Sequence, residues 1–359
     1  MYESAFKLDD SIIYLNHAAV SPWPVRTAQA VKAFADENAS LGSMNYPGWI
    51  KQEAAVREQL RKLLNAASTD EIALLKSTSE ALSVVAYGLP WQSGDNVVIT
   101  SQEFPSNRIV WESLDRLGVE TRPADIAGEQ SPEQAIIACM DTRTRLLSVS
   151  SVQFGTGLAL DLDVLGNTCR ERDILFCIDA IQSLGAMEFD VQGCQADFVM
   201  ADAHKWMMGP EGIALFYCRN EIMDQLTLRQ YGWHMVEDHM NFDSPSWDVA
   251  SSARRFECGS PNMTGIHALH ASLSLIHETG MPAIQEQVLD NSRFMLDFFN
   301  EHSDRFRLLT PQEDNRFAGI VTFRPRDETP ESLFEMLTAQ NVFCALRGGG
   351  VRFSPHFYT

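Results

Sequence analysis

The feature that most constrains the fold of this chain is an alternation, between residues 72 and 218, of short apolar runs with longer amphipathic segments. The runs are rich in Val, Ile, Leu and Phe and are apolar on both faces, as strands covered by helices on two sides should be. They lie at residues 72–76, 96–100, 145–152, 174–180, 197–203 and 212–218. Helices are predicted between them at residues 79–89, 106–117, 131–140 and 163–173. The pattern predicts an α/β fold with a doubly wound, mostly parallel sheet.

The segments on either side of this alternation show a different pattern of predicted helices and strands. Two amphipathic helices are predicted before it, at residues 22–41 and 48–66. After it we expect helices at 264–280, 281–302 and 330–340, with strands at 305–310, 319–325 and 341–347. This order predicts an N-terminal arm (1–21), a large domain (22–257) and a smaller α+β C-terminal domain (258–359).

The composition narrows the choice of partners. The chain carries 28 Lys and Arg against 48 Asp and Glu, and a net charge of −20 repels nucleic acid and anionic lipid. No apolar run approaches the roughly 18 residues of a membrane helix, and the start lacks the pattern of a secretory signal. The seven cysteines form no CxxC pair. We therefore expect a cytoplasmic protein with no membrane or nucleic-acid partner.

The sequence also lacks residues at the spacing of metal ligands. His267, His270 and His277 share one face of a predicted helix, but no acidic or Cys partner lies near them, so a polar helix face is the preferred interpretation. The aromatic segment 231–247 is interpreted as a loop that shapes an active-site entrance or a dimer contact. No metal site is predicted.

Polar residues follow the predicted strands at their carboxyl ends, where open α/β sheets bind ligands. Ser77, Thr78 and Ser79 begin a helix after the first strand, which is the local structure of an anion site or of a plain helix cap. Asp179 ends a fully apolar strand, where a carboxylate is costly without a cation, although it can also cap a turn. Lys205 follows His204 after another strand, and burial there would favour the neutral amine that attacks carbonyls. A lysine that reaches solvent is the plainer alternative.

An anion site, a carboxylate and an activated lysine at one sheet edge are what pyridoxal phosphate (PLP) requires. At these positions the sequence resembles the class V aminotransferase family of fold type I PLP-dependent transferases. That family includes cysteine desulfurases, isopenicillin N epimerase-like proteins, kynureninase and several aminotransferases. The matching stretches are YLNHAAVSP (14–22), STSEA (77–81), SQEFPSN (101–107), IDAIQSLG (178–185), DFVMADAHKWMMGPEGIALFY (197–217), RFECGSPN (255–262) and RGGGVRFSPHFYT (347–359).

The resemblance implies two catalytic residues and a set of cofactor contacts. Lys205 would form the Schiff base with PLP and then move the Cα proton, and Asp179 would pair with the pyridine nitrogen. Gln182 would bind the phenolic oxygen. The remaining cofactor residues are then Thr78, Ser79 and His204 at the phosphate, Phe104 on the ring face, Gln153 near the ring, and Ser260, which would reach the phosphate of a partner subunit.

The resemblance also implies a small amino-acid substrate and a homodimer with shared active sites. Arg352 would grip the substrate carboxylate, a bidentate task that suits a guanidinium. Arg347 would be a second anion contact. Asn16 and His17 would line the substrate mouth.

Two departures from the family pattern bear on the reaction. Desulfurases carry a nucleophilic cysteine a few residues after an R-x-G stretch, but Arg347 is followed by Gly348, Gly349, Gly350 and Val351. Cys344 precedes that loop and is interpreted as a core thiol. Asp202 stands where a Ser or Thr often touches the phosphate, so that contact is not assigned to it.

These residues predict a PLP-dependent enzyme that acts at the α-carbon of a small amino acid. We rank an aminotransferase first. A carbon–sulfur lyase or desulfurase-like enzyme and an amino-acid epimerase are the alternatives, although a persulfide on the loop after Arg347 is disfavoured. A non-catalytic dimeric module is a remote alternative, because such a module would not need Lys205, Asp179, Gln182 and Arg352 together.

Overall fold

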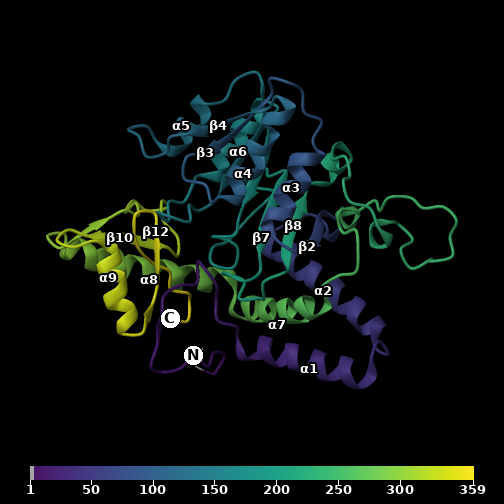
Figure 1. The fold of residues 1–359 in the computed structure, drawn as a ribbon, viewed down its shortest axis with the longest axis horizontal. Helices are drawn as coiled ribbons and strands as arrows, with labels where there is room; N and C mark the ends of the chain where they lie inside the picture. Colours follow the sequence, from purple (N-terminus) through teal and green to yellow (C-terminus); the bar gives the residue numbers. More distant parts are fainter. Residues whose placement is uncertain (1–3) are drawn as a thin grey trace.

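A computed structural model describes residues 4–359, so the first three residues of the expected N-terminal arm lie outside the described part. Its centre is a seven-stranded sheet of order β2-β8-β7-β6-β5-β3-β4 (Figure 1). The strands are β2 (Ile72–Leu75), β3 (Asn96–Thr100), β4 (Glu120–Ala124), β5 (Thr144–Ser150), β6 (Leu175–Asp179), β7 (Phe198–Asp202) and β8 (Ala214–Cys218). Only β8 runs antiparallel to its neighbours in this sheet. The predicted α/β class and mostly parallel sheet are confirmed.

Both faces of the sheet are buried, as the apolar strands require. In β6, Phe176 and Ile178 enter one hydrophobic core and Cys177 enters the other, because successive side chains of a strand point to opposite faces. The helices that contribute to the first core include α2 (Tyr46–Leu64), α5 (Pro132–Ala138), α6 (Leu162–Glu171) and α7 (Met263–Thr279). The second core is covered by α3 (Thr78–Gly88) and α4 (Ser106–Glu112), with the short helices η2 (Ser113–Leu117) and η3 (Asn220–Gln225).

Besides the two-residue strand β1 (Ile13–Tyr14), the sequence analysis missed two strands. The edge strand β4 carries Glu120, Arg122 and Pro123, and it has no apolar run because one of its sides has no neighbouring strand to pair with. The strand β13 (Gly350–Phe353) begins in the glycine-rich loop after Arg347. Both segments form strands because they pair with neighbouring strands, and not because their own residues have an apolar pattern.

The C-terminal part forms a second, antiparallel sheet of order β12-β13-β10-β9. Its other strands are β9 (Phe306–Leu308), β10 (Val321–Pro325) and β12 (Ala345–Arg347), and it packs with α8 (Met281–Glu301) and α9 (Pro330–Ala339) around a core that includes Phe299 and Phe323. The helix α7, which falls within the segment expected as the small domain, buries residues such as Leu269 in the core of the large sheet. The predicted domain limits remain a prediction.

The N-terminal segment ties the two parts together. The strand β1 (Ile13–Tyr14) pairs in parallel with β11 (Val342–Phe343) of the C-terminal part. The helix α1 (Val25–Leu41) then lies along α7, where Arg26 binds Glu278 at 2.7 Å (Figure 1). Residues 14–22 therefore pass between the two sheets, close to the carboxyl ends of the large-domain strands.

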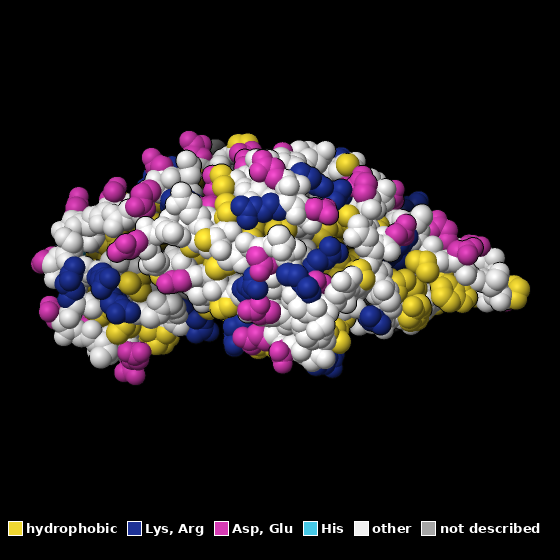
Figure 2. All heavy atoms as spheres, turned by 90° about the horizontal axis from the view of Figure 1, so that it is seen from above, with side chains coloured by type: hydrophobic (Ala, Val, Ile, Leu, Met, Phe, Trp, Pro, Cys, Tyr) yellow, Lys and Arg dark blue, Asp and Glu magenta, His cyan; other side chains and the backbone are white. Residues whose placement is uncertain are grey.

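A long loop, residues 231–250, projects from the large domain (Figure 1) and contains only the short helix η4 (Trp233–Met235). Hydrophobic side chains gather at that end of the molecule (Figure 2). Tyr231, Phe242 and Trp247 are all more than half exposed there. Among residues 4–359, no helix has both the length and the apolar character needed to cross a membrane.

Candidate active site

Lys205 and Asp179 lie at the same edge of the large sheet, because β6 and β7 are adjacent parallel strands that end at Asp179 and Asp202. Lys205 is 9% exposed, and burial lowers the pKa of its amine to about 8 although the negative charge of Asp179 opposes this shift. Burial raises the pKa of Asp179 to about 7, against a hydrogen bond from the Ile181 N–H (3.0 Å). Within residues 4–359, Asp179 forms no direct ion pair, although the charge of Lys205 acts on its carboxylate.

The anion site is predicted at the start of α3. The Ser77 side chain caps the helix by accepting the Glu80 N–H at 3.2 Å. The Thr78 N–H donates to Asp202 Oδ2 at 3.2 Å, and the buried Thr78 hydroxyl has no hydrogen-bond partner. Ser79 is exposed at the same turn, and its hydroxyl binds that of Ser106 at 2.9 Å. The structure thus brings Thr78 and Asp202 into contact at a helix N-terminus.

Two arginines without acidic partners lie on the β12–β13 hairpin. Arg352 is 2% exposed, donates to the Phe154 carbonyl at 2.8 Å, and leaves its Nε without a partner. Burial, followed by the charge of Arg347, lowers the pKa of Arg352 to about 10. Neither guanidinium forms an ion pair within the described residues. Two neighbouring cations with no counter-charge are the setting for an anionic ligand.

The turn of this hairpin fits closely on the large domain. Gly348 and Gly349 adopt φ values of +60° and +79°, which favour glycine. A Cβ on Gly348 would lie 2.2 Å from the Gly155 carbonyl oxygen. The turn is therefore short and well packed, and it places Arg352 near the loop that contains Phe154.

Phe104 and Gln153 have different surroundings. The Phe104 ring is 40% exposed, and its centroid lies 5.6 Å from Lys205 Nζ, so one face of the ring is open beside the lysine. Gln153 is fully buried and binds Thr100 (3.3 Å) and the Ser150 carbonyl (3.3 Å). The place of Gln153 near the cofactor ring stays a prediction, and its amide already has partners within the protein.

Gln182 and His17 are both held by the protein itself. The Gln182 amide donates to the Ala18 carbonyl (3.1 Å) and accepts the Trp206 indole N–H (3.0 Å), which leaves one amide hydrogen for a ligand. His17 is fully buried, and its ring nitrogens bind the Ser354 carbonyl and the Tyr358 hydroxyl, each at 2.8 Å. A place for His17 at the substrate mouth stays a prediction, and both of its ring nitrogens already have protein partners.

Ser260, another predicted site residue, lies at a hollow whose lining does not include Lys205. It is exposed and lines a hollow of about 230 Å³ together with Cys258 and Asn262. An exposed position is what a contact with another subunit would need, and that contact stays a prediction.

Buried polar atoms without hydrogen-bond partners gather in this region. Residues 4–359 contain eight such side-chain atoms, and four belong to predicted site residues: Asn16 Oδ1, Thr78 Oγ1, His204 Nδ1 and Arg352 Nε. A fifth, Ser21 Oγ, lies in the residue whose N–H binds the His204 carbonyl at 2.8 Å. Leaving such atoms unpaired costs about 1–3 kcal/mol each, so their gathering indicates a place for a polar ligand.

Comparison with known proteins gives this site a family. Residues 13–352 match the family described as "Aminotransferase class-V". The chain belongs to the class V aminotransferase family. It is 32% identical over 96% of its length to a "Probable cysteine desulfurase" of Methanothermobacter thermautotrophicus, of which it covers 90%. It is also 28% identical, over 92% of its length and 86% of the relative's, to the "Uncharacterized aminotransferase YcbU" of Bacillus subtilis.

Solved structures agree on the fold. A cysteine desulfurase from Thermococcus onnurineus NA1 has a TM-score of 0.84 and 24% identity over 97% of this chain and 91% of its own. The PLP-containing structure of a C-DES mutant has a TM-score of 0.89 and 19% identity over 97% of this chain and 93% of its own. The class V protein described here is a fold type I PLP-dependent enzyme, and its cofactor is PLP.

The residues of this chain fit that cofactor. Thr78 Oγ1 and His204 Nδ1 are unpaired polar atoms beside a helix N-terminus, which suits a phosphate. Asp179 is a buried carboxylate without a direct ion pair within residues 4–359, which suits a protonated pyridine nitrogen. Lys205 is desolvated, and its lowered pKa makes loss of the ammonium proton easier, which suits a Schiff base. The open face of Phe104 suits a stacked ring.

The sequence analysis did not identify two residues that lie near the site. Glu103 is fully enclosed and accepts hydrogen bonds from the Thr100 hydroxyl (2.9 Å), the Asn107 amide (2.8 Å) and the Ser150 N–H (2.9 Å). Burial raises the pKa of this carboxyl. Its signal was an acidic residue directly after an apolar strand, in SQEFPSN. The other is Ser21, whose signal was its place in the matching stretch YLNHAAVSP.

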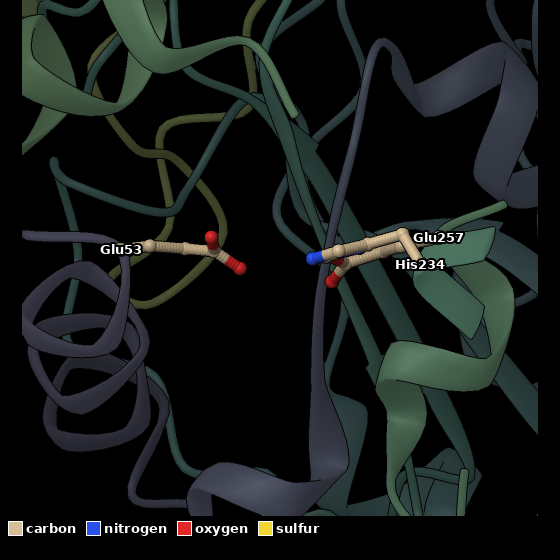
Figure 3. A group of neighbouring side chains, drawn as sticks. All are labelled: Glu53, His234 and Glu257. Carbon is tan, nitrogen blue, oxygen red and sulfur yellow. The ribbon is translucent and has the colours of Figure 1, made fainter. Parts of the chain in front are cut away.

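A second group of buried charges contains Glu53 of α2, His234 of η4, and Glu257, which follows the short helix η5 (Ala253–Phe256) (Figure 3). Arg57 bridges the two carboxylates, with contacts of 2.6 Å to Glu53 and of 2.6 and 2.8 Å to Glu257. The Leu74 N–H also donates to Glu257 at 2.7 Å. Arg57 thus supplies the cation that these acids need, and we assign no metal to them.

Proposed function

We propose that the chain is a PLP-dependent carbon–sulfur lyase that acts on cysteine or a cysteine-derived amino acid. The observation that carries the proposal is the hairpin at residues 347–350, which joins the substrate arginines and contains no cysteine. The similarity to a "Probable cysteine desulfurase" supports sulfur chemistry over the aminotransferase that the sequence analysis ranked first. The missing thiol favours release of the sulfur over its transfer to the protein.

The other cysteines are poor substitutes for a loop nucleophile. Cys344 is buried, and burial raises the pKa of its thiol to about 11, which keeps it protonated and unreactive. Cys258 is partly exposed but lies near Ser260, in the hollow that does not include Lys205.

Each site residue has a definite task in this proposal. Arg352, supported by Arg347, binds the substrate carboxylate and so fixes Cα beside Lys205. Lys205 takes the Cα proton as a neutral amine, since its pKa of about 8 leaves a substantial neutral fraction near neutral pH. Asp179 keeps the ring nitrogen protonated. Bound PLP supplies the electron sink that makes loss of the Cα proton and cleavage of the Cβ–S bond feasible.

A transaminase is the second candidate, because the relative YcbU is described as an aminotransferase. An epimerase would use the same residues, with the proton returned to the other face of Cα. The three reactions share the first proton transfer and differ in their products.

Product analysis separates these candidates. The holoenzyme is incubated with L-cysteine, L-cystine or L-alanine, and sulfide, pyruvate, alanine, D-amino acid and pyridoxamine phosphate are measured. A lyase gives pyruvate and reduced sulfur from the sulfur substrates, and Cys344→Ser and Cys258→Ser leave this rate unchanged. Alanine together with a protein-bound persulfide would overturn the proposal in favour of a desulfurase. Pyridoxamine phosphate with a keto acid would make the enzyme a transaminase.

We further propose a homodimer in a reducing cytoplasm, with Ser260 reaching the phosphate of the partner subunit. The seven free cysteines and the exposed position of Ser260 support this arrangement. Light scattering is expected to give twice the mass of the chain. Ser260→Ala should weaken PLP binding without changing that mass, and a monomer that retains full PLP affinity would contradict the arrangement.

A further inference from the structure

Asp202 places a carboxylate at the helix N-terminus where the phosphate of PLP is expected. It is the last residue of β7 and pairs with Ala214 of β8, so its backbone is fixed by the sheet. Its Oδ2 accepts the N–H of Thr78, the first residue of α3, at 3.2 Å. Without the cofactor, this carboxylate already neutralises the positive end of the helix.

The neighbouring polar atoms show that the site is built for more than Asp202. Thr78 Oγ1 and His204 Nδ1 are both buried and have no partner. Asp202 therefore satisfies one donor of the site and leaves these two atoms to another group. A phosphate that binds them comes close to the carboxylate.

Two anions at one helix N-terminus repel each other unless a proton lies between them, as in pairs of carboxylates that share a site. The charged or titratable groups whose fields reach Asp202 are His204, Lys205 and Asp179. Glu211 adds a negative charge near His204. Burial favours the protonated form of Asp202 and raises the pKa of its carboxyl.

We propose that Asp202 couples binding of the cofactor's phosphate to uptake of one proton, which the carboxyl group and the phosphate then share. The proton comes from solvent, and no bond other than a hydrogen bond is made or broken. Asp202 is thus a residue that selects the protonation state of the bound phosphate. The inference rests on PLP as the cofactor and not on cleavage of carbon–sulfur bonds, so a failed lyase assay leaves it unchanged.

The test compares binding of pyridoxamine 5′-phosphate and of pyridoxamine to the cofactor-free full-length chain from pH 6.5 to 8.5. These ligands carry an amine in place of the aldehyde, so they form no Schiff base with Lys205. The ratio of their dissociation constants cancels the titration of Lys205 and Asp179 and isolates the phosphate. Since the second pKa of a phosphate ester is near 6, the free ligand is a dianion over most of this range.

In the unmodified chain, the phosphate's advantage should fall by up to about tenfold for each pH unit. In Asp202→Asn the ratio should be independent of pH. At pH 8.5, pyridoxamine 5′-phosphate should bind to this variant at least about tenfold more tightly than to the unmodified chain. Titration calorimetry in two buffers of different ionisation enthalpy should count up to one proton taken up by the unmodified chain and none by the variant.

Two further variants make the result decisive. Asp202→Ser should behave as Asp202→Asn does, so the conclusion does not depend on the folding of one protein. His204→Asn should keep the pH dependence. A pH dependence that survives in both Asp202 variants, or one that disappears only in His204→Asn, would overturn the inference, as would a ratio independent of pH in the unmodified chain.

Discussion

Two groups of buried charges in this molecule differ in one respect. At the Lys205 site, Asp179 and Arg352 are almost inaccessible, yet neither forms an ion pair within residues 4–359. In the other group, Arg57 binds both Glu53 and Glu257 at 2.6 Å. Burial is similar in the two places, but only the second group contains direct ion pairs.

We interpret the paired charges as structural and the unpaired charges as functional. A buried charge costs several kcal/mol unless a partner compensates it, so an uncompensated one is retained where a ligand supplies the partner. Arg57 is compensated and therefore ties α2 to the segment after η5. In our proposal, the cofactor ring compensates Asp179 and the substrate carboxylate compensates Arg352.

The largest effect is expected for Lys205→Ala. Loss of the amine removes both the attachment of PLP and the base for the Cα proton, so turnover should fall by at least about 10³-fold. Since the lysine is buried without an ion pair, the free energy of unfolding of the cofactor-free protein should not fall. Product formation and urea denaturation measure the two quantities, and Lys32→Ala is the surface control. A variant that kept most of its activity would break the comparison.

The second prediction concerns Arg57→Met. Removing this guanidinium leaves Glu53 and Glu257 uncompensated in the interior, which should lower the free energy of unfolding by about 3–5 kcal/mol. The control is Arg108→Met, which breaks an exposed pair with Glu112 and should cost no more than about 0.5 kcal/mol. The folded fraction of Arg57→Met should retain its kcat, because Arg57 belongs to the compensated group. A stable Arg57→Met variant would mean that the two groups do not differ in the way described.

Much of the fold was predictable because most of its strands are rich in apolar residues. Every predicted strand of the large sheet is present within about two residues of its expected ends, whereas β4 was missed because an exposed edge strand needs no apolar run. That Lys205 and Asp179 lie at one edge was also predictable, since the carboxyl ends of parallel strands meet there; their roles stay predictions.

Side-chain direction was not predictable. Gln153 and His17 occupy positions near the site in sequence order, but the first points into the core and the second binds the C-terminal segment. The contact of Asp202 with Thr78 depends on how β7 and α3 approach each other, which residue order does not specify. Hydrogen-bond partners that are distant in the sequence decide these cases.

The third prediction uses the pH dependence of stability. The pKa of Lys205 is about 8 in the folded protein and 10.5 when unperturbed. Between these values the unfolded chain holds a proton that the folded chain lacks, so the free energy of unfolding of the cofactor-free protein rises with pH. Below pH 8 both states are protonated and this contribution does not change. Lys205→Met should remove a rise of about 3 kcal/mol at most between pH 8 and 10.5, and urea titrations across this range measure it.

The smallest effect is expected for Arg352→Gln, which tests the uncompensated group from the substrate side. Loss of hydrogen bonds from a charged donor to the substrate carboxylate should raise KM by about 10- to 100-fold. The change in kcat should be smaller, because Lys205 and Asp179 remain in place. Arg352→Lys should rescue KM only in part, since an ammonium lacks the planar fork of a guanidinium. The free energy of unfolding should stay the same or rise, since a buried cation without an ion pair has been removed. If Arg352→Gln instead destabilised the protein as strongly as Arg57→Met and left KM unchanged, Arg352 would be a structural residue, and its missing ion pair would say nothing about the substrate.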